Sequence, residues 1–490
     1  MKQTERGFLD LSETARSKAD TEAKFSALRW ERLCESYLPV KSEDTFWRFS
    51  RQTKTQEPAQ GWKLHLSATI LEACDLFERI APFLISQDVR FKAPESLTEL
   101  LKINCGLQYG YCQVGKFMTV YPSTEKKAIG LARELHRLTG DFTPIAVPFD
   151  ARYLPHSSVF YRYGAFAPIE FKDENGKTLP AVKNLSEELV YDDRFQAVPE
   201  WLSDPFQNNL KKTAAAAETE ETPLMTTYKV FRAITQRGKG GTYKALDFSR
   251  NPPRLCVVKE GRRHGEVYWN GQDGYFLVKN EFEVIKALSK HYQNAPQVFN
   301  SFEADGNFYL VMEYVEGKSL HDLMKFRRRR FSVKQVLGFA CGIAEIIEEI
   351  HQTGWIWNDC KPANLIVANN KSLRPIDFEN SFAVNKSARF DWRSNRFSKP
   401  FKNQTSAYSN DLYALGAVVY FLLTGKFYNP LEPVAVKKLR RNVPPQFEEI
   451  IENLLCDLVL EKETNASEIR AEFEKVSETL RFNANDSRIS

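Results

Sequence analysis

The sequence lacks the features that mark secreted, membrane-spanning and strongly nucleic-acid-binding proteins. The formal net charge over 490 residues is only +5, which implies no nucleic-acid or membrane-surface role for the chain as a whole. The longest strongly apolar run, Ala414–Thr424, is about half of the ~20 residues that a transmembrane helix needs. Met1 is followed by charged residues and not by the apolar core of a signal peptide. We therefore expect a cytoplasmic protein that binds neither nucleic acid nor membrane.

Cysteine is sparse, and no two cysteines are spaced as a metal-binding or redox pair. The chain has eight cysteines and no C-x-x-C motif, which favours reduced, mostly buried thiols over a disulfide framework. Because paired ligands at zinc spacing are missing, the sequence predicts no zinc. With 42% hydrophobic and 13% aromatic residues the chain is globular, and 490 residues are too many for a single core. No internal repeat is evident.

What the sequence does contain is a dense run of catalytic residue types in its second half. Asp359, Lys361 and Asn364 lie within one short segment, and Asp377 opens an Asp-Phe-Glu triplet. Phosphoryl transfer from ATP needs a carboxylate beside the acceptor hydroxyl, a cation on the transferred phosphate and oxygen ligands for Mg²⁺. The order of these residues predicts that Asp359 orients the hydroxyl and Lys361 neutralises the γ-phosphate. Asn364 and Asp377 would hold Mg²⁺.

The preceding segments follow the order of a kinase N-lobe. Glycines before a predicted strand suit a phosphate-covering loop, because backbone N–H groups can approach phosphates closely there. Lys259 on the next strand fits the lysine that contacts the α- and β-phosphates, and Glu281 fits its partner on a helix. The predicted nucleotide-binding residues are Gly238, Gly240, Gly241, Lys259, Glu281, Glu313 and Val315, the last two in a hinge-like segment. The expected nucleotide is ATP, with GTP or another nucleoside triphosphate as the alternative.

Three departures from the usual kinase pattern stand out. Trp357-Asn358 replaces the usual His-Arg before the catalytic aspartate, and Glu379 replaces the glycine after Asp-Phe. No Ala-Pro-Glu motif lies between Asp377 and Asp411. Without the loop arginine, control by a phosphorylated activation loop is not expected, since that control needs a cation to bind the phosphate. The intact catalytic residues favour an active kinase over a pseudokinase.

The first 200 residues have no counterpart in ordinary kinases and read as alternating helices and strands. The expected strands are 62–67, 89–91, 114–121 and 157–163, and the expected helices are 11–40, 68–84 and 126–138. A polar stretch of low sequence complexity at residues 203–222 then indicates a linker. We predict an α+β fold with a first domain at 1–202, a linker at 203–226 and a bilobal kinase-like domain at 227–490. Its N-lobe would span 227–312 and its C-lobe 313–482.

The predicted strands of the first domain carry an unusual set of basic residues. Lys63 and His65 share one side of a strand, two residues apart, and Lys92, Lys116 and Arg162 lie on three other strands. If the strands converge, these side chains and several tyrosines form a pocket with no acid among them. Such a pocket suits a phosphate ester and its β-elimination, which needs a base, an acid and cations. The alternative is that Lys63 and His65 face solvent while the aromatic residues pack a core.

Resemblance to a known family favours the first interpretation. The segments GWKLHLSA (61–68), GKFMTVYP (115–122) and YRYGAF (161–166) resemble the N-terminal lyase region of class III lanthipeptide synthetases. The kinase, with its Asp-Phe-Glu variant, resembles that family's central domain. The lyase region is in turn similar to bacterial phosphothreonine lyases, which share the Lys-x-His element. The implied fold is a phosphothreonine-lyase-like α+β domain followed by a bilobal kinase domain.

The resemblance implies a role for each basic residue. His65 would be the general acid and Lys92 the general base, and Lys63 would stabilise developing charge. Lys116 and Arg162 would bind phosphate, and Tyr121 would line the site. The implied activity is a peptide dehydratase that phosphorylates Ser/Thr of a ribosomal precursor peptide with a leader, then eliminates phosphate to leave dehydroalanine or dehydrobutyrine.

Three points stay open at this stage. Family members usually continue into a cyclase that binds zinc through two Cys and one His, and nothing similar is present here. Either a separate cyclase serves a two-domain form, or the chain is truncated. The rival functions are a plain Ser/Thr kinase with a regulatory N-terminal domain and a peptide-binding scaffold without activity. The oligomeric state is not readable from the sequence.

Overall fold

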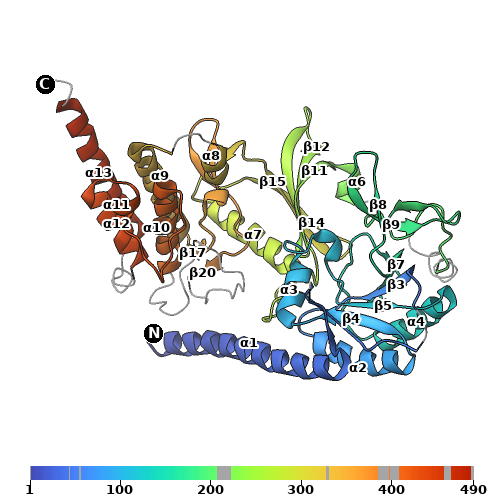
Figure 1. Ribbon diagram of the computed structural model, residues 1–490. Coiled ribbons are helices and arrows are strands. Elements are labelled where there is room, and N and C mark those ends of the chain that lie inside the picture. The colour runs from blue at the N-terminus through green and yellow to red at the C-terminus, as the bar shows by residue number, and fades with distance from the viewer. Residues whose placement is uncertain are drawn as a thin grey trace.

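The computed structural model describes residues 2–43, 45–54, 57–206, 222–326, 330–384, 397, 408–456 and 465–486. An N-terminal α+β domain lies against a bilobal domain, whose small lobe occupies the middle of the molecule (Figure 1). The α+β prediction is confirmed. No helix among these residues is both long and apolar enough to cross a membrane.

A seven-stranded sheet forms the centre of the N-terminal domain. Its strand order is β1-β2-β4-β5-β3-β7-β6, and every pairing is antiparallel. The strands are β1 (Val40–Lys41), β2 (Trp47–Phe49), β3 (Gln60–Leu66), β4 (Arg90–Pro94), β5 (Met118–Tyr121), β6 (Ala151–Arg152) and β7 (Val159–Ala165). Strands β4, β3 and β7 carry Lys92, Lys63 with His65, and Arg162, and they are neighbours of β5, which Lys116 precedes by two residues.

Helices bury one face of this sheet. They are α1 (Lys2–Tyr37), α2 (Ala73–Ser86), α3 (Leu97–Cys105) and α4 (Glu125–Leu138). The alternation of β3 sends Leu64 and Leu66 into a core with Phe77 of α2 and Trp30 of α1, whose rings meet at 4.9 Å. The opposite face of β3 therefore carries Lys63 and His65. A smaller sheet, β10-β9-β8, is formed by β8 (Glu170–Lys172), β9 (Thr178–Lys183) and β10 (Leu189–Tyr191).

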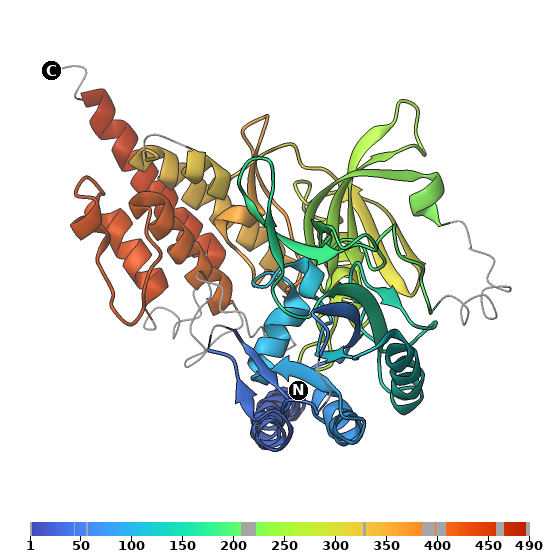
Figure 2. The same ribbon diagram turned by 45° about the vertical axis from the view of Figure 1, so that its right-hand side comes forward.

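The second domain has the two lobes of a kinase (Figure 2). Its small lobe is a sheet of order β11-β12-β13-β15-β14 with one helix against it. These elements are β11 (Tyr228–Arg237), β12 (Gly240–Asp247), β13 (Arg254–Gly261), α7 (Gly274–Leu288), β14 (Val298–Ala304) and β15 (Asn307–Glu313), preceded by α6 (Pro223–Thr226).

The large lobe is mainly helical. Its helices are α8 (Leu320–Phe326), α9 (Val333–Gln352), α10 (Ser409–Thr424), α11 (Val436–Leu439), α12 (Pro445–Leu455) and α13 (Ala466–Asp486). Short strands β16 (Gly317–Ser319), β17 (Trp355–Ile356), β18 (Leu365–Ala368), β19 (Leu373–Pro375) and β20 (Phe382–Ala383) frame the loops between them. Nearly every residue of α10 is buried, so the apolar run noted in the sequence is the centre of the large lobe.

Several sequence predictions differ from the structure in detail. The predicted strand 114–121 is wrong in its first half, because Gly115 has a φ of +75° and only Met118–Tyr121 is extended. The helix α3 and the β8–β10 sheet were not predicted. At the expected linker, Phe206 is fully buried against Trp62 and Tyr161, so residues 203–206 pack on the first domain. Residues 207–221 lie outside the described residues.

The two domains contact each other through the turn of the β11–β12 hairpin. The amide of Gly238 donates a hydrogen bond to Cys105 O over 3.1 Å, and a side chain on Gly238 would meet Asn104 O at 1.7 Å. Trp269, which precedes α7, packs on the core of the N-terminal domain. Glycine is therefore required at position 238 by the contact between domains.

Candidate active sites

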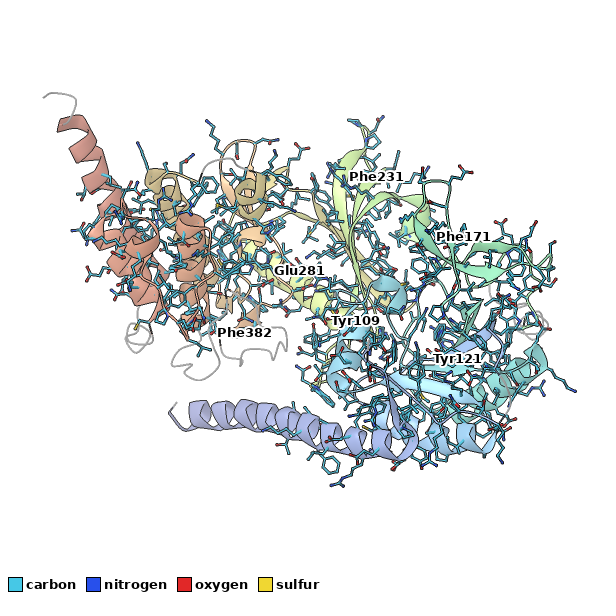
Figure 3. The ribbon with its side chains drawn as sticks, in the orientation of Figure 1. Tyr109, Tyr121, Phe171, Phe231, Glu281 and Phe382 are labelled. Atoms are coloured by element: carbon cyan, nitrogen blue, oxygen red, sulfur yellow. The ribbon has the colours of Figure 1, made fainter. Side chains whose placement is uncertain are left out.

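Three ion-paired side chains join the lobes of the second domain. Lys259 Nζ of β13 lies 2.8 and 2.6 Å from the carboxylate oxygens of Glu281 on α7, and 2.8 Å from Asp377 Oδ1. Burial alone would lower the pKa of Lys259, but the carboxylates of Asp377 and Glu281 raise it. The lysine therefore stays charged. Figure 3 places Glu281 at the inner edge of the small lobe.

The catalytic loop collects the other predicted kinase residues. Asp359 accepts hydrogen bonds from Lys361 Nζ at 2.6 Å and from Asn364 Nδ2 at 2.9 Å. Burial raises the pKa of Asp359 to about 6, against the opposing charge of Lys361. Because the amide nitrogen of Asn364 is engaged with Asp359, its carbonyl oxygen is the atom left for a metal ion.

Two residues hold this loop in place. Asp411, at the start of α10, accepts hydrogen bonds from the amides of Trp357 (2.8 Å) and Asn358 (2.7 Å). The indole N–H of Trp357 donates to Asp377 O over 3.1 Å, and its ring stacks on Phe378. Tryptophan in place of the usual histidine thus still connects the catalytic loop to the Asp-Phe-Glu segment. The positioning role of Asp411 was missed, although a buried acid at the start of an apolar helix is a signal for it.

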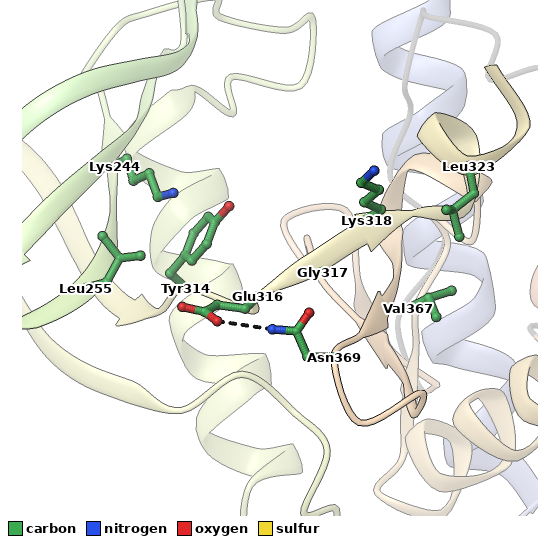
Figure 4. Close-up of a pocket in the computed structure, with 9 residues that line it drawn as sticks. All are labelled: Lys244, Leu255, Tyr314, Glu316, Gly317, Lys318, Leu323, Val367 and Asn369. Atoms are coloured by element: carbon green, nitrogen blue, oxygen red, sulfur yellow. Dashed lines mark hydrogen bonds between the residues drawn. The ribbon is translucent and has the colours of Figure 1, made fainter. Parts of the chain in front are cut away.

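A cavity of 490 Å³ opens beside the hinge between the lobes (Figure 4). Lys244 Nζ lies 3.9 Å from the ring centroid of Tyr314, and Glu316 accepts a hydrogen bond from Asn369 over 3.2 Å. Glu313 is held by Arg374, with one contact of 2.9 Å. The amide of Val315 makes no hydrogen bond to any other described residue. It is available to a nucleotide base.

Taken together, these residues fit a nucleoside triphosphate and Mg²⁺. The charged Lys259 and Lys361 suit phosphate oxygens. Asp377, whose pKa is held below its usual range by Lys259 and Lys361 despite burial, stays ionised as a metal ligand. Magnesium commonly takes one or two protein oxygens and completes its shell with phosphate and water.

The glycines of the β11–β12 hairpin have different roles. Gly240 has a φ of +140°, and a side chain there would meet Glu260 O at 1.8 Å, so it is needed for the turn itself. Gly238 contacts the N-terminal domain, as described above. Between them, Lys239 is ion-paired with Glu379, the residue that replaces the usual glycine after Asp-Phe.

The second candidate site is the polar face of the N-terminal sheet. Residues directly opposite in antiparallel strands share a face. The register pairs Lys92 with Thr119 and Thr119 with His65, which puts Lys92 and His65 in one row. In the next row Lys63 lies opposite Arg162. The four strands therefore converge as predicted, and the alternative in which Lys63 and His65 face solvent is wrong: His65 is buried and Lys63 is largely so.

Tyr121 lies on the same face as Lys63. It is opposite Arg90 on β4, and its ring meets Phe166 edge-on at 5.2 Å. Figure 3 shows it in the N-terminal domain, away from Glu281. Tyr121 is buried, and burial raises its pKa, so the phenol is neutral and serves as a wall or a hydrogen-bond donor.

Two acids reach this face from outside the four strands. Asp150 contacts His65 Nδ1, and its other oxygen lies 3.0 Å from Lys116 Nζ. Asp192 accepts a hydrogen bond from Arg162 over 2.7 Å. The expectation of a pocket without acids was wrong, because both residues lie in segments for which no strand was predicted. Asp150 immediately precedes β6 (Ala151–Arg152), which is too short to show the alternating polar and apolar residues by which a strand is predicted.

Other basic groups on this face have no acid partner. Among the described residues, Lys63 Nζ has no hydrogen-bond or ion-pair partner, and Lys92 Nζ contacts only aromatic rings, those of Trp47 at 4.3 Å and Phe49 at 5.9 Å. The buried Nε of Arg162 also lacks a hydrogen-bond acceptor. Burial, aided by neighbouring cations such as Arg162 and Lys116, lowers the pKa of Lys63 to about 7 and that of Lys92 to about 8. The arrangement provides unpaired donors for an anion and an amine that can lose its proton near neutral pH.

In comparisons with known proteins, the two parts of the chain match two different families. Residues 37–219 match the family described as RamC, N-terminal domain, and residues 237–488 match the protein kinase domain. The chain is 28% identical over 363 residues to the probable SapB synthase of Streptomyces coelicolor, covering 71% of this chain and 38% of that protein. It is 31% identical over 216 residues to serine/threonine-protein kinase B of Synechocystis sp., covering 41% of this chain and 37% of that kinase.

The kinase match spans more than half of the sequence, so the chain belongs to the protein kinase family. A RamC-type domain in front of the kinase gives it, more narrowly, the domain order of class III lanthipeptide synthetases, and the resemblance noted in the sequence is confirmed. The chain spans under two-fifths of the length of these two relatives.

The Asp150 contacts generate a stability prediction. Asp150→Asn keeps the side chain's shape but removes the charge that compensates buried Lys116, whose side chain is 7% exposed. Removing one partner of a buried ion pair typically costs about 3–5 kcal/mol, which urea denaturation of the N-terminal domain would measure. Asp141→Asn, at an exposed acid paired with Arg79, should leave the free energy of unfolding nearly unchanged, because solvent screens exposed ion pairs. Equal effects of the two changes would contradict a buried role for Asp150.

Proposed function

We propose that the protein is a peptide dehydratase with two active sites used in series. The kinase domain phosphorylates Ser/Thr of a ribosomally made precursor peptide, and the N-terminal domain eliminates the phosphate to leave a dehydroamino acid. The observation that carries the proposal is that one chain contains two lysine clusters of different kinds. Lys259 is ion-paired to carboxylates at the kinase site, whereas Lys63 and Lys92 have no carboxylate partner among the described residues at the other site.

In the kinase step, Asp359 orients the acceptor hydroxyl and accepts its proton, and Lys361 contacts the transferred phosphate. Asp377 and Asn364 would hold Mg²⁺, and the ion would supply positive charge to the phosphates. Lys259, kept charged by Glu281 and Asp377, binds the α- and β-phosphates. Val315 contacts the base through its backbone. We infer ATP as the donor, with GTP as the alternative that the hinge residues leave open.

In the elimination step, neutral Lys92 removes the Cα proton of the phosphorylated residue. The electron pair of that C–H bond becomes the Cα=Cβ double bond, and the Cβ–O bond breaks to release phosphate. Lys63 and the free Nε of Arg162 hold the phosphate oxygens. His65 donates a proton to the departing oxygen. Asp150 accepts a hydrogen bond from His65 Nδ1–H and so fixes the orientation of the imidazole ring.

The protonation of His65 depends on the substrate. Burial, together with Lys116 and Lys63, lowers the pKa of His65 to about 4 in the free protein, despite Asp150. A phosphate dianion beside the ring opposes those cations and raises the pKa. Binding of the phosphopeptide therefore supplies the charge that keeps the acid protonated.

We assign elimination to residues 1–202, extended to Phe206 by its packing, and phosphorylation to 227–490. The peptide would be presented by a leader sequence.

The kinase assignment predicts that Asp377→Asn abolishes phosphorylation and dehydration of unmodified peptide. A synthetic phosphopeptide should still lose phosphate, because elimination uses no nucleotide. Intact-mass analysis distinguishes a loss of about 18 Da (dehydration) from a gain of about 80 Da (phosphorylation). Lys229→Met removes an exposed lysine of β11 and should leave both reactions unchanged. Failure of the Asp377→Asn protein on phosphopeptide would contradict independent sites.

The lyase assignment predicts the complementary result. Lys92→Met and His65→Asn should stall the reaction at phosphopeptide, because a general base or acid contributes roughly 10²–10⁴-fold each. Quantifying phosphopeptide over time with Mg-ATP present measures this accumulation. Undiminished dehydration in both variants would overturn the assigned roles. If the protein without any substitution adds phosphate but never eliminates it, the protein is instead a plain Ser/Thr kinase.

The pKa of Lys92 predicts the pH dependence of kcat for elimination. Lys92 must be neutral to accept the Cα proton, so kcat rises as pH increases toward about 8. Rates at saturating synthetic phosphopeptide from pH 6 to 8 test this. A profile that is flat over this range would contradict the assignment of Lys92 as the base.

A further inference from the structure

Lys239 lies at the point of the small lobe where kinases cover the nucleotide phosphates. It occupies the turn between β11 and β12, and its side chain is only 13% exposed. The turn is fixed on three sides. Gly238 is bonded to Cys105 of the N-terminal domain, the amide of Arg262 donates to Lys239 O over 2.8 Å, and Gly274 leaves room for that carbonyl, since a side chain there would lie 1.8 Å from it.

The partner of Lys239 is the residue that departs from the kinase pattern. Glu379 follows Asp377 by two positions, is 10% exposed and is ion-paired with Lys239. Its backbone carbonyl accepts a hydrogen bond from Asn280 of α7 over 3.3 Å. A carboxylate thus lies under the phosphate-covering turn, next to a metal ligand, where other kinases have a glycine without any side chain.

The charges of the cleft relate the Lys239–Glu379 ion pair to the binding of nucleotide phosphates. Lys239 is one of three lysines, with Lys259 and Lys361, whose charge acts on Asp377. Because the charge of Lys239 acts on Asp377, it would also act on a triphosphate bound to the metal that Asp377 would hold. Carboxylate and phosphate oxygens are the same kind of acceptor for an ammonium group, and phosphate carries more charge.

We propose that Lys239 is a phosphate-binding residue of the kinase and that Glu379 holds its ammonium group until a nucleoside triphosphate replaces that carboxylate. This inference rests on the kinase half of the proposed function. Glu379 then acts as a competitor that lowers affinity for the triphosphate but not for nucleotides with too few phosphates to reach the turn. The exchange breaks one ion pair and forms another, and no covalent bond changes.

Calorimetric titration with a non-hydrolysable ATP analogue and Mg²⁺, and separately with AMP, tests the exchange without requiring peptide. Lys239→Met should weaken binding of the triphosphate about 10-fold or more and leave AMP within about 2-fold. Glu379→Gln should strengthen triphosphate binding several-fold. Lys229→Met, at an exposed lysine of β11, is the matched control and should bind both ligands like the unmodified protein.

The double variant decides between binding and mere structure. If Lys239 contacts phosphate, adding Lys239→Met to Glu379→Gln should still lose about 10-fold in triphosphate affinity. If Lys239 serves only to neutralise Glu379, adding Lys239→Met to Glu379→Gln should leave the triphosphate affinity unchanged, and the proposal is then wrong. Retained AMP binding shows that each variant is folded, and lost AMP binding in Lys239→Met would count against a phosphate-specific role. An unmodified protein that binds neither ligand would overturn the kinase function itself.

Discussion

Burying a lysine ammonium is unfavourable unless a carboxylate is buried with it, and both candidate sites are shaped by this constraint. At the kinase site the constraint is met by pairing. Lys259 bridges Glu281 and Asp377, and Lys361 contacts Asp359. The Lys259–Asp377 contact crosses from the small lobe to the large one, so an ion pair that keeps Lys259 charged also ties the two lobes together.

At the N-terminal sheet the constraint is met only in part. Asp150 and Asp192 compensate Lys116 and Arg162, while Lys63 and Lys92 are left with lowered pKa values. The unpaired lysines destabilise the fold relative to paired ones, which is typical of sites where reactivity has been retained. Their position is fixed by antiparallel register, since a shift of one residue would turn the whole row into the helix-covered core.

The sequence was most informative where the chemistry is local. Asp359, Lys361 and Asn364 lie within six residues, so their spacing alone brings them together on one loop. The period-2 alternation of Lys63 and His65 likewise gave their shared face. Asp150 and Asp192 could not be found this way, because they come from irregular segments whose position depends on long-range packing. The contact of Gly238 with Asn104 was equally invisible, since a glycine-rich turn suits phosphate binding just as well.

In the proposed two-step reaction, the opposite demands on lysine would explain why one chain has two sites. Phosphoryl transfer needs ammonium groups that remain charged beside developing negative charge, and carboxylates must lie close to them. Proton removal from Cα needs an amine that is neutral near pH 7, and a nearby carboxylate would raise its pKa and prevent this. At a pKa of about 8, Lys92 is neutral in roughly one-tenth of molecules at pH 7, whereas the carboxylates of Asp377 and Glu281 raise the pKa of Lys259 and keep it charged. Because a single cluster cannot hold its lysines in both states, the proposed reaction requires the phosphorylated residue to leave the paired cluster and enter the unpaired one.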